Sequence, residues 1–161
     1  YSAAIDLACA MADAIRAVFG RKADLTLLYT TRAPEAWLSS AWRHNLFGYR
    51  VTEDFATFRQ TYAESADFAA ILDKIAARLP KARIIAAALE TTTLSGGHPA
   101  DAVLSLLDLP ATLRADLRYP AARNVGWDDQ RSAQLLALNR SDLDDASLRA
   151  AKQALRRTAA D

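Results

Sequence analysis

The pattern of apolar positions divides the chain into helical stretches and two short apolar runs. Residues 2–19 are predicted to form a helix, because Ile5, Cys9 or Met11, Ile15 and Val18 form an apolar stripe and Gly20 follows as a natural stop. Residues 24–31 and 83–89 have the length and apolar content of buried strands. Strands separated by helices indicate a helix-rich α/β protein with a parallel sheet.

The remaining helices are predicted from spacing and capping signals. Between the two strands we expect helices over residues 34–46, 53–63 with Thr52 as the N-cap, and 67–79 with Ser65 as the cap. After the second strand we expect a helix over 100–108, mostly irregular chain over 111–127, and a helix over 132–138 capped by Asp128 or Asp129. Asp142 or Asp144 opens a last helix to about residue 158, whose basic residues are expected on a solvated face: Arg149, Lys152, Arg156 and Arg157.

Two strands are too few for a covered parallel sheet. A strand as apolar as residues 25–29 expects a neighbour on each edge. Either further strands escaped detection or a preceding N-terminal part supplies them, and we favour the second explanation. The sheet is therefore expected to be incomplete, and its open edge to associate with another chain.

Composition limits the classes of partner and compartment. The 161 residues carry a net charge of +1, which gives no electrostatic reason to expect a nucleic-acid or membrane partner. No apolar run approaches the roughly 20 residues that span a bilayer. One cysteine, Cys9, fits a reducing, cytoplasmic location, and two dispersed histidines predict no metal site.

The segment that follows the first strand has the features of an anion site. Arg32 ends the strand, Pro34 occupies a first helical position, and Glu35 suits the first turn. A helix start beside a guanidinium attracts anions. Ser40 and His44 lie one turn apart on the flank away from the apolar stripe of that helix.

Arg32, Pro34 and Ser40 resemble the 3′-phosphate-binding motif of the PAPS-dependent sulfotransferases. In that family an Arg ends a strand, a Pro follows two residues later, and a Ser comes eight residues after the Arg. The segment Ser-Ala-Trp-Arg-His at 40–44, the strand ending in Glu90, and Leu-Leu-Ala-Leu-Asn-Arg-Ser at 135–141 are similar to the bacterial branch. The resemblance implies a P-loop-like three-layer α/β/α fold, with residues 1–161 as a single domain whose N-terminal strand and phosphate loop are missing.

The resemblance also implies roles for further residues. Arg32 and Ser40 would hold the 3′-phosphate, while in a C-terminal loop Arg123 would reach a phosphate and Trp127 would stack on the base. The Arg-Lys-Gly triplet of the better-known cytosolic enzymes is absent from this loop. His44 and Glu90 are candidates for substrate contact. Each of these residues also has a structural alternative. Arg32 could be a surface arginine at a strand end, and Ser40 could bond to the carbonyl four residues back. His44 could be solvated, and Glu90 could cap a neighbouring helix.

The implied activity is transfer of a sulfuryl group from PAPS to a hydroxyl or amine of a small-molecule or carbohydrate acceptor, without a metal. No Gly-x-x-x-x-Gly-Lys-Ser/Thr phosphate loop occurs in the chain, and no general base can be assigned. We therefore expect this chain alone to bind PAP weakly and to turn over little. The alternatives are a non-catalytic sulfotransferase-like interaction module and, less favoured, a P-loop kinase.

Overall fold

The computed structural model describes residues 2–20, 22–90, 98–119 and 127–157. Its contacts divide the chain into two compact units. The first unit comprises Tyr1–Pro34 and Glu64–Pro120, and the second comprises Glu35–Ala63 and Ala121–Asp161. Each unit is described by itself below, and the prediction of one domain over residues 1–161 stays a prediction.

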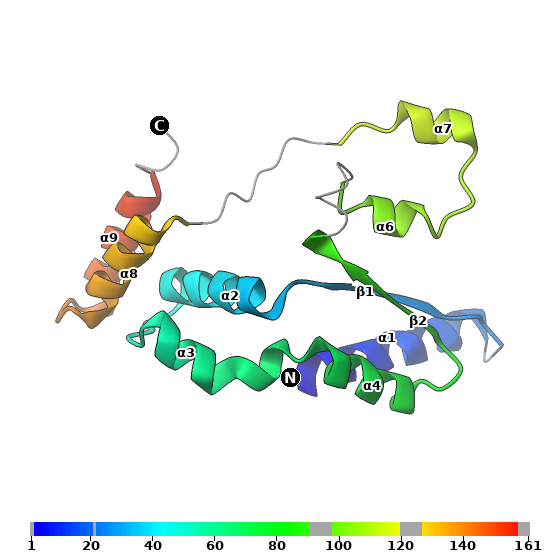
Figure 1. Cartoon of the computed structure of the whole chain (residues 1–161), viewed down its shortest axis with the longest axis horizontal. Coiled ribbons are helices and arrows are strands. Elements are labelled where there is room, and N and C mark those ends of the chain that lie inside the picture. The colour runs from blue at the N-terminus through cyan, green and yellow to red at the C-terminus, as the bar shows by residue number, and fades with distance from the viewer. Residues whose placement is uncertain (1, 21, 91–97, 120–126, 158–161) are drawn as a thin grey trace. The chain divides into compact units, whose positions relative to one another are not determined.

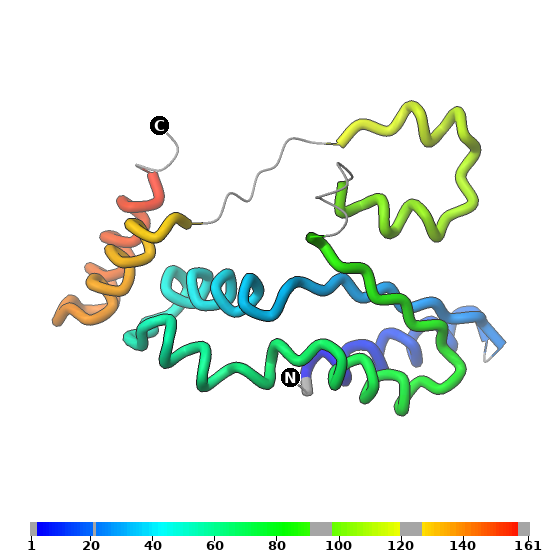
Figure 2. The backbone as a smooth tube through the Cα atoms, viewed as in Figure 1, coloured from blue at the N-terminus to red at the C-terminus, as the bar shows by residue number. Residues whose placement is uncertain are grey.

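Both predicted strands form, and they pair with each other in the first unit. β1 (Thr26–Thr31) and β2 (Arg83–Ala88) run parallel, with Thr26 opposite Arg83 and Thr31 opposite Ala88. The two strands are hydrogen-bonded neighbours, and their segments overlap in the view of Figure 2. The helix-rich α/β class with a parallel sheet is therefore confirmed, and within the described residues this sheet has two strands.

Two helices build the core of the first unit against this sheet (Figure 1). Helix α1 (Ser2–Phe19) ends before Gly20, whose φ of 87° is the left-handed conformation that glycine adopts without steric cost. Its buried side chains pack against α4 (Phe68–Arg78). The core cluster consists of Ile5, Ala8, Ala12, Ile71, Ile75 and Leu79, with Leu27, Tyr29 and Ile84 of the strands packed on it.

Aspartates, not the predicted hydroxyl residues, cap two of the helices. Asp67 accepts the Ala70 N–H at 3.0 Å and starts α4, so the prediction of Ser65 as the cap was wrong. Asp54 accepts the Thr57 N–H at 2.9 Å and starts α3 (Phe55–Tyr62), in place of Thr52. A carboxylate is a stronger acceptor for helix N–H groups because it also complements the helix dipole.

The helices after β2 also depart from the predictions. Helix α6 spans only Asp101–Leu104, shorter than the expected 100–108. Helix α7 (Ala111–Asp116) lies where mostly irregular chain was expected, directly after Pro110. The fixed φ of Pro110 favours a helix that starts at the next residue, and this helix forms although the segment is short.

The second unit is built from helices. Helix α2 (Pro34–Gly48) begins at the predicted proline, α3 follows it, and α8 (Asp129–Arg140) packs against α9 (Asp145–Arg157). A short 3₁₀ helix, η1 (Ala63–Ala66), follows α3 along the chain. Asp128 caps α8 by accepting the Arg131 N–H at 2.7 Å. Leu46 and Leu135 are fully buried.

Two polar side chains from α8 and α9 enclose the end of α2. The Asn139 amide donates to the Leu46 carbonyl at 3.0 Å and to the Val51 carbonyl at 2.8 Å. Lys152 donates to the carbonyls of Leu46 at 2.7 Å and Tyr49 at 2.8 Å. We call Asn139 and Lys152 the α2 clamp, because they satisfy carbonyls that the helix end leaves without partners.

The clamp corrects the prediction that Lys152 lies on a solvated face. Lys152 is only 5% exposed and Asn139 only 1%. The other three basic residues of that set, Arg149, Arg156 and Arg157, are exposed as expected. Lys152 lies one helical turn from Arg149 and Arg156, but its side chain is buried because the end of α2 offers it three carbonyl acceptors.

Candidate functional site

The carboxyl ends of β1 and β2 form one edge of the sheet, and two charged side chains meet there. The register places Thr31 opposite Ala88, so the chain leaves both strands at the same level. Arg32 is the first residue after β1, and Glu90 lies two residues after β2. This is the edge at which open parallel sheets bind their ligands.

Arg32 and Glu90 form an ion pair. Nε of Arg32 lies 3.5 Å from Oε1 of Glu90, and the two side chains are 40% and 36% exposed. The backbone N–H groups of Glu90 and Ala33, together with the Arg32 guanidinium, hold the pKa of the Glu90 carboxylate below its usual value despite partial desolvation.

The ion pair leaves part of the guanidinium for another anion. Its contact with Glu90 uses Nε, the nitrogen nearest the backbone. Nε of Arg32 is buried and makes no hydrogen bond to the described residues, so its contact with Glu90 is an ion pair and not a hydrogen bond. A planar guanidinium carries five N–H donors, so a partner at one of them leaves other donors for a second anion.

The other two motif residues lie at the start of α2. Pro34 is the first residue of α2, and Ser40 lies in its second turn with an exposed side chain. Arg32 belongs to the first unit and Ser40 to the second, so a shared phosphate site stays a prediction. His44 is also exposed on α2, whereas Leu38 and Leu46 are buried, which agrees with the predicted flank.

The predicted nucleotide residues of the C-terminal loop are placed only in part. Arg123 lies outside the described residues. Trp127 is half-buried and stacks on Phe47, with ring centroids 5.4 Å apart and planes 27° apart. The Arg156 guanidinium lies 5.5 Å from the centre of the same Phe47 ring. Trp127 therefore has an aromatic partner within its own unit, and its contact with a base stays a prediction.

A polar cluster that the sequence did not predict lies between α6 and the residues after α7. His98 stacks on Tyr119 with ring centroids 4.1 Å apart, and the Tyr119 hydroxyl donates to Asp101. Asp101 also accepts the His98 N–H at 2.6 Å. The hydrogen bond from Tyr119 lowers the pKa of Asp101, and the same bond raises the pKa of Tyr119. This cluster ties the turn before α6 to the chain beyond α7.

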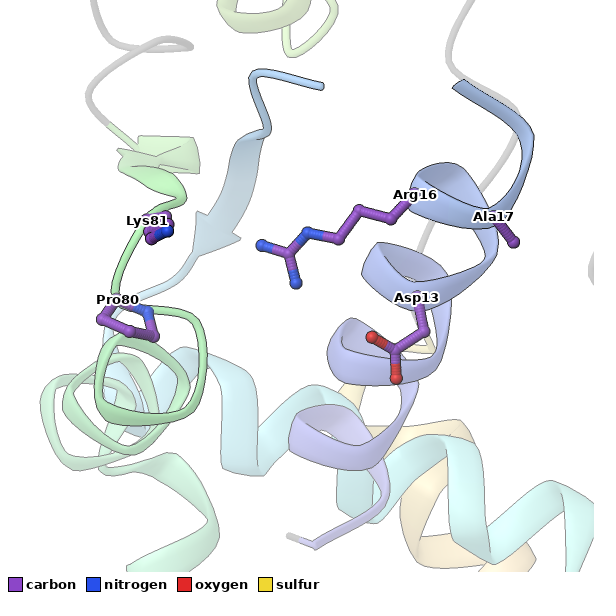
Figure 3. Close-up of a pocket in the computed structure, with 5 residues that line it drawn as sticks. All are labelled: Asp13, Arg16, Ala17, Pro80 and Lys81. Atoms are coloured by element: carbon purple, nitrogen blue, oxygen red, sulfur yellow. The ribbon is translucent and has the colours of Figure 1, made fainter. Parts of the chain in front are cut away.

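A hollow of about 590 Å³ lies at the opposite end of the strands from Arg32 and Glu90. Its wall comes from Asp13, Arg16 and Ala17 of α1 and from Pro80 and Lys81, which precede β2. Figure 3 shows the Arg16 guanidinium reaching across this hollow. Arg16 lies in the last turn of α1, and Lys81 follows the C-terminus of α4. Positive charge at these places interacts favourably with the helix dipole. The hollow therefore belongs to the amino-terminal edge, away from the edge where ligands of parallel sheets bind.

Among the described residues, no group of three histidine, cysteine or acidic side chains is arranged to hold a metal ion. None of the helices in those same stretches has both the length and the apolar character needed to cross a membrane. Comparisons of the chain with protein-family models, curated proteins and solved structures find no match.

Proposed function

We propose that the chain is the 3′-phosphate-binding part of a PAPS-dependent sulfotransferase of the bacterial type. The observation that carries the proposal is the connection from β1 to α2. Arg32 lies at the carboxyl edge of a parallel sheet, and Pro34 then starts a helix whose second turn exposes Ser40. Strand, arginine, proline-started helix and exposed serine follow in the order of the 3′-phosphate motif that the sequence resembles, and a helix N-terminus beside a guanidinium attracts anions.

In this proposal the chain belongs to a P-loop-like three-layer α/β/α domain in the cytoplasm. Arg32 and Ser40 bind the 3′-phosphate of PAPS and so position the sulfuryl group for transfer to a hydroxyl or amine acceptor. Positioning of the donor contributes to the rate because it removes the entropy cost of bringing donor and acceptor together. His44, Arg123 and Trp127 are the further candidates for contact with nucleotide or substrate.

The test is a thermal shift with PAP, the product nucleotide, on the wild type and two variants. PAP at about 100 times its Kd adds roughly 2.7 kcal/mol to the free energy of unfolding. We expect Arg32→Ala and Ser40→Ala to lose this shift, while Ser39→Ala, which removes the neighbouring hydroxyl, keeps it. AMP is the matched ligand because it lacks the 3′-phosphate, so its effect should be equal in the wild type and in Arg32→Ala.

One observation favours the alternative, a sulfotransferase-like interaction module without catalysis. Leu7, Met11 and Val18 of α1 are 61%, 54% and 75% exposed and recur at helical spacing. An apolar stripe of this kind is a feature of surfaces that contact other proteins. A folded wild type that shows no PAP shift would mean that this chain is not a competent nucleotide site, and the same test on a longer chain with the phosphate loop would then distinguish a missing loop from this alternative.

A further inference from the structure

We propose that Glu90 is a positioning residue that orients the Arg32 guanidinium toward the bound anion. This inference rests on the proposed function and deepens it. The sequence suggested Glu90 as a contact for the acceptor, whereas the ion pair assigns it a role through Arg32.

The Glu90 carboxylate lies beside backbone groups of two segments. The N–H groups of Glu90 and of Ala33, which lies between Arg32 and the first residue of α2, both favour its ionised form and lower its pKa. The carboxylate thus links the end of β2 to the turn after β1. Backbone N–H groups at the ends of two paired strands move less than a long side chain, so the carboxylate is a fixed point for Arg32.

A fixed carboxylate on Nε determines the direction of the terminal nitrogens of Arg32. The guanidinium is planar, and its five donors form a rigid fork. When Nε faces Glu90 at 3.5 Å, the terminal nitrogens are the part left to meet an anion. Arginine loses rotamer freedom when it binds a ligand, and prior orientation by Glu90 reduces this loss.

The same carboxylate also opposes the binding of an anion, because it partly neutralises Arg32. The two effects predict opposite results when Glu90 is removed. If orientation dominates, the affinity for PAP falls; if neutralisation dominates, the affinity rises. Orientation is favoured because the contact uses Nε and the Arg32 side chain remains 40% exposed.

The experiment is a calorimetric titration with PAP of the wild type, Glu90→Ala and Glu90→Gln. We expect Kd to rise about tenfold in Glu90→Ala, because the guanidinium then has to be ordered when it binds. Glu90→Gln should stay within about threefold of the wild type, because glutamine keeps the shape of the side chain and an oxygen that can face Arg32. Glu64→Ala removes an exposed carboxylate elsewhere in the same unit and is the matched control.

An unchanged or lower Kd in Glu90→Ala overturns the inference. If Glu90→Ala does not fold, Glu90→Asp replaces it, since the shorter side chain keeps the charge and withdraws it from Arg32. An unchanged or lower Kd in Glu90→Asp has the same meaning.

Failure of the proposed function gives a different result. In that case the wild type binds no PAP, and the role of Glu90 is read from the ¹⁵N-resolved Nε–H signal of Arg32, assigned by its absence in Arg32→Ala. Slower exchange of this proton with water in the wild type than in Glu90→Ala supports the positioning role, whereas equal exchange overturns it.

Discussion

Replacement of Lys152 by methionine tests the α2 clamp most directly. Methionine keeps most of the length and apolar contact of the lysine side chain and removes its three N–H donors. In the wild type these donors reach the carbonyls of Leu46 at 2.7 Å, Tyr49 at 2.8 Å and Phe47 at 3.3 Å. The lysine is only 5% exposed, so water cannot simply replace it.

The expected loss in the free energy of unfolding is about 2 to 3 kcal/mol. A hydrogen bond from a charged donor contributes about 1.5 to 3 kcal/mol, but the effects are not additive here. Asn139 still donates to the Leu46 and Tyr49 carbonyls, at 3.0 and 3.3 Å. Removal of a buried ammonium also recovers its desolvation cost, which offsets part of the loss.

Urea unfolding followed by tryptophan fluorescence is the appropriate assay. The three tryptophans, Trp37, Trp42 and Trp127, all lie in the second unit, which contains the clamp. Arg157→Met is the matched control, because it removes an exposed positive charge from the same helix. A loss in Lys152→Met no larger than that in Arg157→Met would refute the assignment of Lys152 as a structural clamp.

The pH dependence of this difference has a definite sign. Burial, and secondarily the charge of Arg50, lowers the pKa of Lys152 below the ordinary value of 10.5. At pH values between the lowered pKa of Lys152 in the folded chain and its ordinary pKa in the unfolded chain, the unfolded chain binds more protons than the folded chain. The free energy of unfolding therefore rises with pH over this range. The stability of the wild type relative to Lys152→Met should therefore grow as the pH rises toward 10.5, and a difference that shrinks over this range would contradict the assignment.

Three further variants probe other contacts. Asn139→Asp places a carboxylate against carbonyl oxygens and should lower the free energy of unfolding by about 2 kcal/mol or more in the same assay; an unchanged urea midpoint would count against the clamp. Ile75→Ala opens a cavity at a fully buried position and should cost about 2 to 5 kcal/mol, measured by circular dichroism during urea unfolding. A loss below about 1 kcal/mol would mean that the site collapses around the smaller side chain. Asp67→Ala removes the acceptor for the Ala70 N–H and should cost about 1 kcal/mol, while Asp73→Ala on the same helix should be nearly neutral. Equal losses in these two variants would argue against the cap.

The local parts of the structure could be predicted from the sequence. Both strands and the start of α2 at Pro34 were found, because apolar runs and a proline at the first helical position act through neighbouring residues. The predictions of the helix caps were less accurate. Asp54 and Asp67 lie two residues after the predicted caps Thr52 and Ser65, and capping propensity alone does not choose between them.

Contacts between distant segments were decided by the tertiary structure. The sequence identified Arg32 and Glu90 separately, but only the parallel register of β1 and β2 brings their side chains together. Lys152 likewise resembles its solvated neighbours in sequence, and it is buried because the end of α2 presents carbonyl oxygens to it. Helical and strand periodicity specify which faces are apolar, whereas the partner of each polar group depends on which elements fold back against one another.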